Sequence, residues 1–305
     1  MEIQWYPGHM AKARKSIEAE AAGVDLIIEL TDSRTPLSGR NPDIDRTARN
    51  KAHILVMTKA DLADAEVTAA WARYFSRQGI PALPADARDP SLRKKVLALA
   101  REACSRKFEA DRRRGIQKTE IRALIAGIPN VGKSTLINTL AGRASAKTGD
   151  RPGITKSNQW IRADGISLLD TPGLLWPRFE NPKTGLHLAV TGSVRDEILD
   201  LSDPAMELLS ICARWYPGLV GERYGFSEQE ARDDSAARAL PAGAKEDTAV
   251  CLEFLGRIAR SRGCVRNGVT DYRRASGFLL TDFRSGRLGK ISLERPEEAE
   301  AEAGQ

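Results

Sequence analysis

The fold of this chain is decided by one stretch, GIPNVGKST, which covers Gly127–Thr135. It follows an apolar run at 121–126 and opens a helix-like run at 133–142. A glycine-rich turn between a strand and a helix wraps its backbone N–H groups around phosphates, and the helix adds the positive end of its dipole. The stretch therefore predicts a P-loop, the phosphate-binding turn of an α/β nucleotide-binding domain.

Separate roles are predicted along this P-loop. Lys133 reaches the β and γ phosphates and is expected to act in catalysis, while Ser134 offers its hydroxyl to Mg²⁺. The residues predicted to contact the nucleotide here are Asn130, Val131, Gly132, Lys133, Ser134 and Thr135.

Two downstream segments complete the predicted phosphate site. Asp170 follows an apolar run at 166–169 and is expected to hold Mg²⁺, and the backbone N–H of Gly173 is expected to sense the γ-phosphate. A threonine between the P-loop and that run would join Mg²⁺ in the triphosphate state. Thr155 is favoured for this role, with Thr148 as the alternative, because Thr155 lies closer to the next strand.

A base-reading motif lies about seventy residues before the P-loop, in the segment Thr58-Lys59-Ala60-Asp61. The Asp61 carboxylate can accept hydrogen bonds from guanine N1–H and N2–H, whereas adenine would leave it unpaired. Lys59 would lie along the base, and Thr58 stands where such motifs usually carry asparagine. An ordinary turn after a strand is the alternative.

A second base contact is predicted at Asp86 and Ala87, whose backbone N–H groups would reach the guanine oxygen. Asp32, Arg34 and Pro36 also follow a strand, and for them a structural role is favoured over one in positioning switch segments.

The composition suits a globular protein with a polyanionic partner. The 305 residues are 41% hydrophobic and 29% charged, with a net charge of +6. Basic residues cluster at 93–95, 112–114 and 257–274. There is neither a signal-peptide layout nor an apolar run of about 18–20 residues, so a cytoplasmic location is predicted. The four cysteines form no C-x-x-C pair, which argues against structural zinc.

Strands and helices are expected to alternate in the first part of the chain. Strands are predicted at 24–30, 53–57, 121–126 and 166–169, and helices at 10–22, 65–78, 89–109 and 133–142. This alternation predicts a mostly parallel sheet with helices on both faces. Helix-like runs at 196–215, 245–262 and 270–284 predict a separate helical domain. The predicted domains are 1–177, 178–293 and an acidic, disordered tail at 294–305.

Taken in order along nearly the whole chain, the motifs resemble the circularly permuted ribosome biogenesis GTPases of the RbgA/YlqF type. The segments that carry the resemblance are Trp5–Met10, Asp32–Pro36, Asn41-Pro42, Thr58–Asp61, Gly127–Thr135, Gly149–Thr155, Asp170–Gly173 and Asp282–Lys290. The departures are Thr58 in place of asparagine and a degenerate loop around Asp86.

The resemblance implies a circularly permuted P-loop GTPase domain with a C-terminal helical domain that docks on rRNA. It implies a cytoplasmic, GTP-hydrolysing assembly factor that binds the precursor of the large (50S) ribosomal subunit through rRNA and ribosomal proteins, with hydrolysis stimulated by the ribosome. GTP or GDP, Mg²⁺ and K⁺ are the implied cofactors, with Asn130 beside the K⁺. The protein is expected to be a monomer off the ribosome.

Intrinsic hydrolysis is predicted to be slow. Leu174 occupies the position at which Ras-like enzymes carry the glutamine that orients water. His9 is the favoured replacement, a role that the resemblance also implies. The alternatives are that His9 contacts RNA or that the ribosome supplies the group that orients water. The competing function is a nucleotide-gated placeholder on another ribosomal intermediate, such as the small subunit, with little catalytic role.

Overall fold

The computed structural model describes residues 19–117, 120–142, 159–171, 181–236 and 246–303. The chain divides into two compact units. A sheet unit comprises Met1–Pro182 together with Glu294–Gln305, and a helical unit comprises Lys183–Leu293. The chain therefore leaves the sheet unit once and later returns to it.

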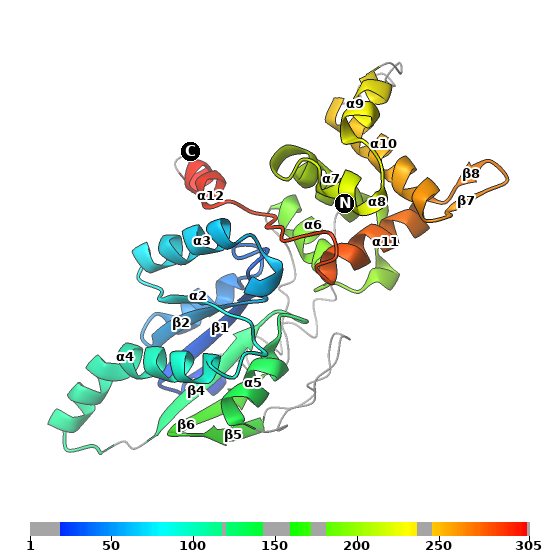
Figure 1. Ribbon diagram of the computed structural model, residues 1–305. Helices are drawn as coiled ribbons and strands as arrows, with labels where there is room; N and C mark the ends of the chain where they lie inside the picture. Colours follow the sequence, from blue (N-terminus) through cyan, green and yellow to red (C-terminus); the bar gives the residue numbers. More distant parts are fainter. Residues whose placement is uncertain (1–18, 118–119, 143–158, 172–180, 237–245, 304–305) are drawn as a thin grey trace. The chain divides into compact units, whose positions relative to one another are not determined.

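The sheet unit is built on six strands in the order β3-β2-β1-β4-β6-β5 (Figure 1). Neighbouring strands pair in parallel, except for β5 and β6, which are antiparallel. The mostly parallel sheet predicted from the sequence is therefore confirmed. The strands are β1 (Leu26–Asp32), β2 (Ala52–Thr58), β3 (Ala82–Pro84), β4 (Ile121–Gly127), β5 (Gln159–Ala163) and β6 (Ile166–Asp170).

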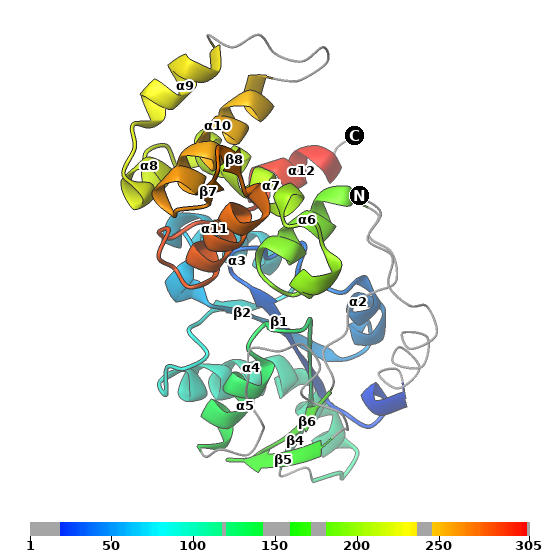
Figure 2. The same cartoon turned by 90° about the vertical axis from the view of Figure 1, so that its right-hand side faces the viewer.

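Helices cover both faces of this sheet. Figures 1 and 2 show α2 and α3 on one face and α4 and α5 on the other. Helix α3 shows why: Val67, Trp71 and Phe75 recur every four residues and pack on Leu55 and Met57 of β2. The helical segments of this unit are α2 (Pro42–Ala48), the 3₁₀ turn η1 (Ala60–Leu62), α3 (Ala65–Arg77), α4 (Leu92–Arg113), α5 (Lys133–Ala141) and α12 (Pro296–Ala303).

The strand that leads into the P-loop, β4, lies in the middle of the sheet but is not the first strand of the chain. Every residue of β1 is buried, as expected for a central parallel strand covered on both faces. Strands β1, β2 and β3 all precede β4, which ends on the P-loop. Helix α4 brings the chain from β3, at one edge of the sheet, back to β4 in its middle. The predicted circular permutation is visible in this connection.

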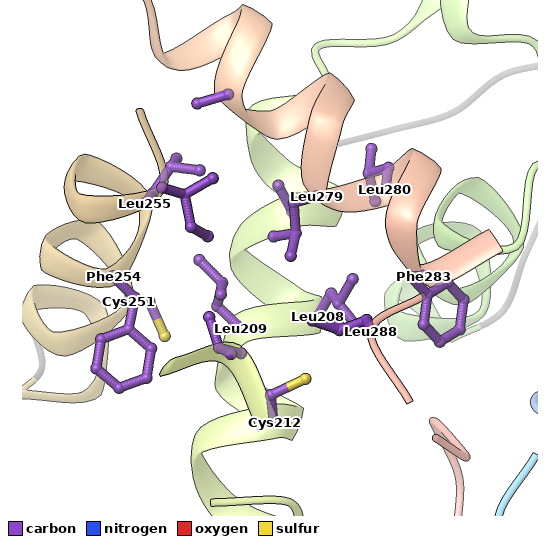
Figure 3. Close-up of a cluster of buried hydrophobic side chains, with 14 of the residues drawn as sticks. Leu208, Leu209, Cys212, Cys251, Phe254, Leu255, Leu279, Leu280, Phe283 and Leu288 are labelled. Carbon is purple, nitrogen blue, oxygen red and sulfur yellow. The ribbon is translucent and has the colours of Figure 1, made fainter. Parts of the chain in front are cut away.

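The helical unit has its own hydrophobic core (Figure 3). Leu208 and Leu209 of α7, Phe254 of α10, and Leu279 and Phe283 of α11 all belong to it. The elements of the unit are α6 (Pro182–Val190), the 3₁₀ turn η2 (Asp196–Ile198), α7 (Ser202–Trp215), α8 (Leu219–Tyr224), α9 (Glu228–Ala236), α10 (Glu246–Ser261), β7 (Val265–Arg266), β8 (Val269–Thr270) and α11 (Tyr272–Arg284).

A short hairpin interrupts these helices where no strand was predicted. Strands β7 and β8 pair antiparallel around Asn267 and Gly268. Both residues adopt positive φ angles, 49° and 76°, which two-residue hairpin turns require and which this pair of residue types tolerates. With two residues in each strand, the hairpin has no run of alternating residues for a sequence pattern to detect.

The acidic tail was predicted to be disordered, but its described residues, 294–303, are ordered and include a helix. Glu294 accepts hydrogen bonds from the backbone N–H groups of Leu37 (2.7 Å) and Ser38 (3.0 Å), and its carbonyl accepts one from Trp71 Nε1 (3.1 Å). Helix α12 then packs on α3, where Arg77 pairs with Glu300. These partners lie more than 200 residues earlier in the chain, so the acidic composition of the tail could not reveal them.

Candidate functional site

The predicted site residues follow strands that end at one edge of the sheet. Strands β1, β2, β3, β4 and β6 run parallel to their neighbours. They end at Asp32, Thr58, Pro84, Gly127 and Asp170. Ligands of open α/β sheets bind outside these carboxyl ends. The strand ends before the two predicted base-reading loops (β2 and β3), before the P-loop (β4) and at Asp170 (β6) therefore share this edge.

The P-loop has the backbone that its sequence predicted. Gly132 adopts φ 97° and Asn130 φ 60°, and α5 begins at the next residue, Lys133. At Gly127 a Cβ atom would lie only 2.9 Å from the carbonyl oxygen of Leu30 and 3.0 Å from Val131 Cγ1. Glycine is therefore required where β4 enters the turn, because any side chain would push the loop away from β1.

The side chains at the base of the P-loop suit a bound phosphate. Lys133 is 8% exposed and Asp170 is 3% exposed. Burial lowers the pKa of Lys133 from its usual value, while the negative charge of Asp170 acts in the opposite direction. A buried ammonium group gains from further negative charge. Ser134, partly exposed at the start of α5, and Asp170 supply the oxygen ligands that Mg²⁺ prefers. These residues fit a nucleotide phosphate with its metal.

Thr58, predicted as a nucleotide contact in the base-reading motif, bonds the P-loop through its side chain. The residue is fully buried, with an exposed fraction of 0%. Its hydroxyl lies 2.5 Å from the carbonyl oxygen of Val131 and 3.0 Å from that of Thr31. The hydroxyl thus fastens the end of β2 to the phosphate loop. Threonine can do so in place of asparagine because a short hydroxyl donor suffices at this distance.

Lys59 is held by Asp32, the last residue of β1. Its backbone is left-handed, with φ 55°, and its Nζ atom lies 3.0 Å from Asp32 Oδ2. Asp32 also takes two bonds from the buried Arg34, Nε to Oδ1 (2.9 Å) and Nη2 to Oδ2 (2.8 Å). Burial alone would raise the pKa of Asp32, but the charges of Arg34 and Lys59 hold it well below its usual range. The structural role predicted for Asp32 and Arg34 therefore extends to orienting Lys59.

The carboxylate of Asp61, predicted to read guanine, is paired with Arg88, a residue that the sequence motifs did not indicate. Arg88 donates from Nη2 to Asp61 Oδ2 over 2.7 Å and also binds Asp86. Asp86 and Ala87 follow β3, and the carbonyl of Ala87 accepts a 2.6 Å hydrogen bond from Thr139 of α5. The loops after β2 and β3 are thus joined to each other, and the latter is joined to the P-loop helix.

Several predicted residues lie outside the described part of the chain. These are His9, Thr148, Thr155, Gly173 and Leu174. Their predicted roles in water activation, Mg²⁺ binding and γ-phosphate sensing therefore remain predictions.

A second set of possible metal ligands lies away from this edge, among the described residues. Ligand atoms of Glu29, Asp45 and His53 come within 4.8 Å of one another. Arg40 pairs with Glu29 and with Asp45, so a guanidinium group already supplies positive charge between the carboxylates. His53 Nε2 lies 3.0 Å from Glu29 Oε2, which gives this histidine a structural partner. This arrangement favours an internal ion-pair network over a bound cation.

Comparisons with known proteins agree with the geometry. A family model described as 50S ribosome-binding GTPase matches residues 122–212. Ribosome biogenesis GTPase A of Bacillus cereus is 43% identical to this chain, over 98% of the chain and 95% of the relative. Among solved structures, GDP-bound YlqF of Thermotoga maritima superposes with a TM-score of 0.60 and 25% identity, covering 92% of this chain and 99% of that one. GNP-bound YlqF of T. maritima gives the same TM-score at 26% identity, with 94% and 99% covered.

Proposed function

The chain belongs to the ribosome biogenesis GTPase A family, and from that premise we propose that it acts on the precursor of the large ribosomal subunit. The protein is a GTPase, and its cofactors are guanine nucleotide and Mg²⁺. One observation of the structure carries the site assignment: the Asp61 loop, the Asp86 loop and the P-loop lie at one edge of the sheet and are tied together by Thr58 and Thr139.

The described residues account for binding and orientation in hydrolysis. P-loop N–H groups and Lys133 gather the phosphates, and their fixed positions stabilise the negative charge that develops on the leaving phosphate oxygens. Ser134 and Asp170 would hold Mg²⁺, which when bound neutralises phosphate charge. Asp61 would accept the two N–H groups of guanine, and Lys59, oriented by Asp32, would lie along the base.

We propose that His9 activates water, because Leu174, at the position of the water-orienting glutamine, carries no hydrogen-bonding group. Intrinsic hydrolysis is accordingly slow and is stimulated by the ribosome. Asn130, left-handed in the P-loop, is proposed to place its side chain beside a K⁺ ion. Thr155 and Gly173 keep their proposed roles as Mg²⁺ ligand and γ-phosphate sensor.

The helical unit is proposed to bind rRNA through its arginines. Asp282 accepts hydrogen bonds from Arg223, Arg262 and Arg287, so three guanidinium groups share one carboxylate and positive charge is in excess. The hairpin and the start of α11 add further exposed basic side chains, at Arg266, Arg273 and Arg274. Such a surface suits a phosphate backbone.

The location and the oligomeric state of the protein are the last points. Among the described residues, no helix combines the length and apolar character needed to cross a bilayer. We propose that the protein works in the cytoplasm, as a monomer when it is off the ribosome.

The experiment that tests this function measures GTP hydrolysis with and without purified large subunits, in K⁺ and in Na⁺. We expect a slow basal rate, stimulation by large subunits, and a higher rate in K⁺ than in Na⁺. His9→Ala is expected to lose the stimulated rate while GDP affinity is retained, which separates catalysis from binding. Lys133→Ala, which removes the phosphate contact, serves as the inactive reference.

Each part of the proposal can fail separately in that experiment. A rate that large subunits do not change contradicts the assembly-factor role. Stimulation by small subunits alone would favour the placeholder on another intermediate. Equal rates in K⁺ and Na⁺ would contradict the K⁺ site proposed at Asn130. An unchanged rate in His9→Ala would show that a group other than His9 activates water.

A further inference from the structure

The carboxylate expected to read guanine has an arginine partner whose contacts are unusual for a surface residue. Arg88 Nη2 donates to Asp61 Oδ2 over 2.7 Å. The same guanidinium group holds Asp86 through two bonds, Nε to Oδ1 at 2.9 Å and Nη2 to Oδ2 at 2.8 Å. One side chain thus bridges a carboxylate from the loop after β2 and a carboxylate from the loop after β3.

Arg88 starts from a backbone that is well anchored. Its own N–H donates to Asp86 Oδ1 over 2.9 Å. On either side of Asp86, Ala85 N bonds the carbonyl of Met57 (2.8 Å), and the carbonyl of Ala87 accepts from Thr139 (2.6 Å). The side chain of Arg88 is 69% exposed, but its planar fork is fixed by Asp86, so little freedom is lost when it also contacts Asp61.

The contact to Asp61 leaves capacity for a base. Two carboxylate oxygens together offer about four acceptor sites, and Arg88 uses one of them on Oδ2. Guanine presents N1–H and N2–H side by side, so it needs both oxygens of Asp61 in the plane of the base. An arginine bonded to one oxygen restricts rotation of the carboxylate without covering that pair of acceptor sites.

Charge balance favours the same arrangement. The hydrogen bonds and charge of Asp86, together with the charge of Asp61, raise the pKa of Arg88. The hydrogen bond from Arg88 in turn lowers the pKa of Asp86. Arg88 and Asp86 are therefore both held in their charged forms, and the positive charge of the arginine contacts both the Asp61 and the Asp86 carboxylates.

We propose that Arg88 is a positioning residue that determines base specificity, by fixing the Asp61 carboxylate in the orientation that accepts both N–H groups of guanine. The inference rests on the proposed role of Asp61 as the guanine reader. It adds to that role a residue outside the T-K-x-D motif, contributed by a different loop. The side chain of Asp86 acts through Arg88, as its anchor.

The test compares GDP with inosine diphosphate, which keeps N1–H but lacks the 2-amino group. Calorimetry gives the Kd of each nucleotide for the full-length protein. Arg88→Ala is expected to weaken GDP binding by about three- to tenfold, the scale of a lost charged hydrogen bond at an exposed site, and to weaken inosine diphosphate less. The preference for GDP therefore falls. Asp86→Ala should also lower the preference for GDP over inosine diphosphate. Arg88→Lys keeps the positive charge but not the planar guanidinium group, so its preference should lie between those of Arg88→Ala and the unchanged protein.

A matched control is available in the same unit. Arg46 is another exposed arginine that pairs with a carboxylate, Asp43 of α2, and neither residue has a predicted role in nucleotide binding. Arg46→Ala is expected to leave the affinities for both nucleotides unchanged. Thermal unfolding without nucleotide checks that each variant is folded. If Arg88→Ala is not folded, Asp86→Ala and Arg88→Lys are compared with the unchanged protein instead.

The outcomes separate this inference from the proposed function beneath it. Asp61→Asn must lose the preference for GDP over inosine diphosphate; if it does not, the base site itself is misassigned. If Asp61→Asn loses the preference and the Arg88 variants keep it, Asp61 reads the base without help and the inference is wrong. Tighter GDP binding by Arg88→Ala would also overturn it, because the arginine would then compete with the base.

Discussion

Removing the hydroxyl of Thr58 while keeping its shape distinguishes support of the P-loop from contact with the nucleotide. The residue is fully buried, and its hydroxyl lies within hydrogen-bond distance of the carbonyls of Val131 and Thr31. Thr58→Val replaces the hydroxyl with a methyl group of similar volume. The substitution therefore takes a donor away from the P-loop and changes little else in the packing.

The expected size of the effect follows from these contacts. A hydroxyl has one hydrogen, so one of the two carbonyls loses a donated bond. Leaving a buried polar group without its partner costs about 1–3 kcal/mol. We expect the free energy of unfolding of the nucleotide-free protein to fall by about 1–2 kcal/mol. Because Val131 lies in the P-loop, we also expect the Kd for GDP to rise by about three- to tenfold, or ~0.7–1.4 kcal/mol.

Urea unfolding without nucleotide and calorimetric GDP titration measure the two effects separately. Thr58→Ser retains the hydroxyl and should recover most of both. Thr68→Val is the matched control, since the hydroxyl of Thr68 donates within α3 to the carbonyl of Asp64 (2.6 Å). That carbonyl keeps the backbone N–H of Thr68 as a donor at 2.9 Å. This control should lose less stability than Thr58→Val and keep its GDP affinity.

One pattern of results would refute the reasoning from burial. If Thr58→Val weakened GDP binding while the nucleotide-free protein kept its full stability, the hydroxyl would act on the nucleotide and not on the P-loop. Loss of stability with unchanged GDP affinity would limit Thr58 to a role in folding.

Three further predictions concern charge and the tail. Because burial has lowered the pKa of Lys133, GDP binding at alkaline pH should take up protons, since phosphate charge raises that pKa again. Equal calorimetric heats in buffers of different ionisation enthalpy would contradict this. Burial alone would raise the pKa of Asp282, but hydrogen bonds from Arg223 and Arg287 lower it to about 2. The stabilisation that the ionised carboxylate gives is therefore present above the unfolded pKa of ~3.9 and is lost as pH falls through 2. In urea unfolding, Asp282→Asn should lower the free energy of unfolding by about 1–2 kcal/mol at pH 7 and by much less at pH 2. An equal loss at both pH values would show that charge is not responsible. Trp71→Phe removes the donor to the carbonyl of Glu294 and should increase hydrogen exchange in α12, and unchanged exchange would mean that this bond does not hold the tail.

Long apolar runs next to motifs made the central strands predictable. Strands β1, β2, β4 and β6 were predicted to within a few residues, because central parallel strands are buried on both faces and appear as continuous apolar runs. The three residues of β3 and the edge strand β5 carry no such run. Pro84 ends β3, where a proline also argues against a strand in the sequence.

Site residues could be predicted where a local motif alone fixes their position. They could not be predicted where a contact with a residue distant in the sequence fixes it. The motif predicted the turn of the P-loop at Gly132 because the required φ and the following helix are local. The contact between Thr58 and Val131 joins residues 73 positions apart, and that between Arg88 and Asp61 joins residues 27 apart. Spacing within a motif holds no information on either pair.

The return of the chain at Glu294 changes how the helical unit is connected to the nucleotide site. The sequence predicted one connection, the segment after Asp170, on the phosphate side. The structure adds a second: Glu294 binds the backbone of Leu37 and Ser38, in the loop that begins after Asp32, and Asp32 pairs with Lys59, which is predicted to lie along the base. The helical unit is therefore inserted into the sheet unit and not appended to it. The chain thus joins the helical unit to the sheet unit at both ends, after Pro182 and before Glu294.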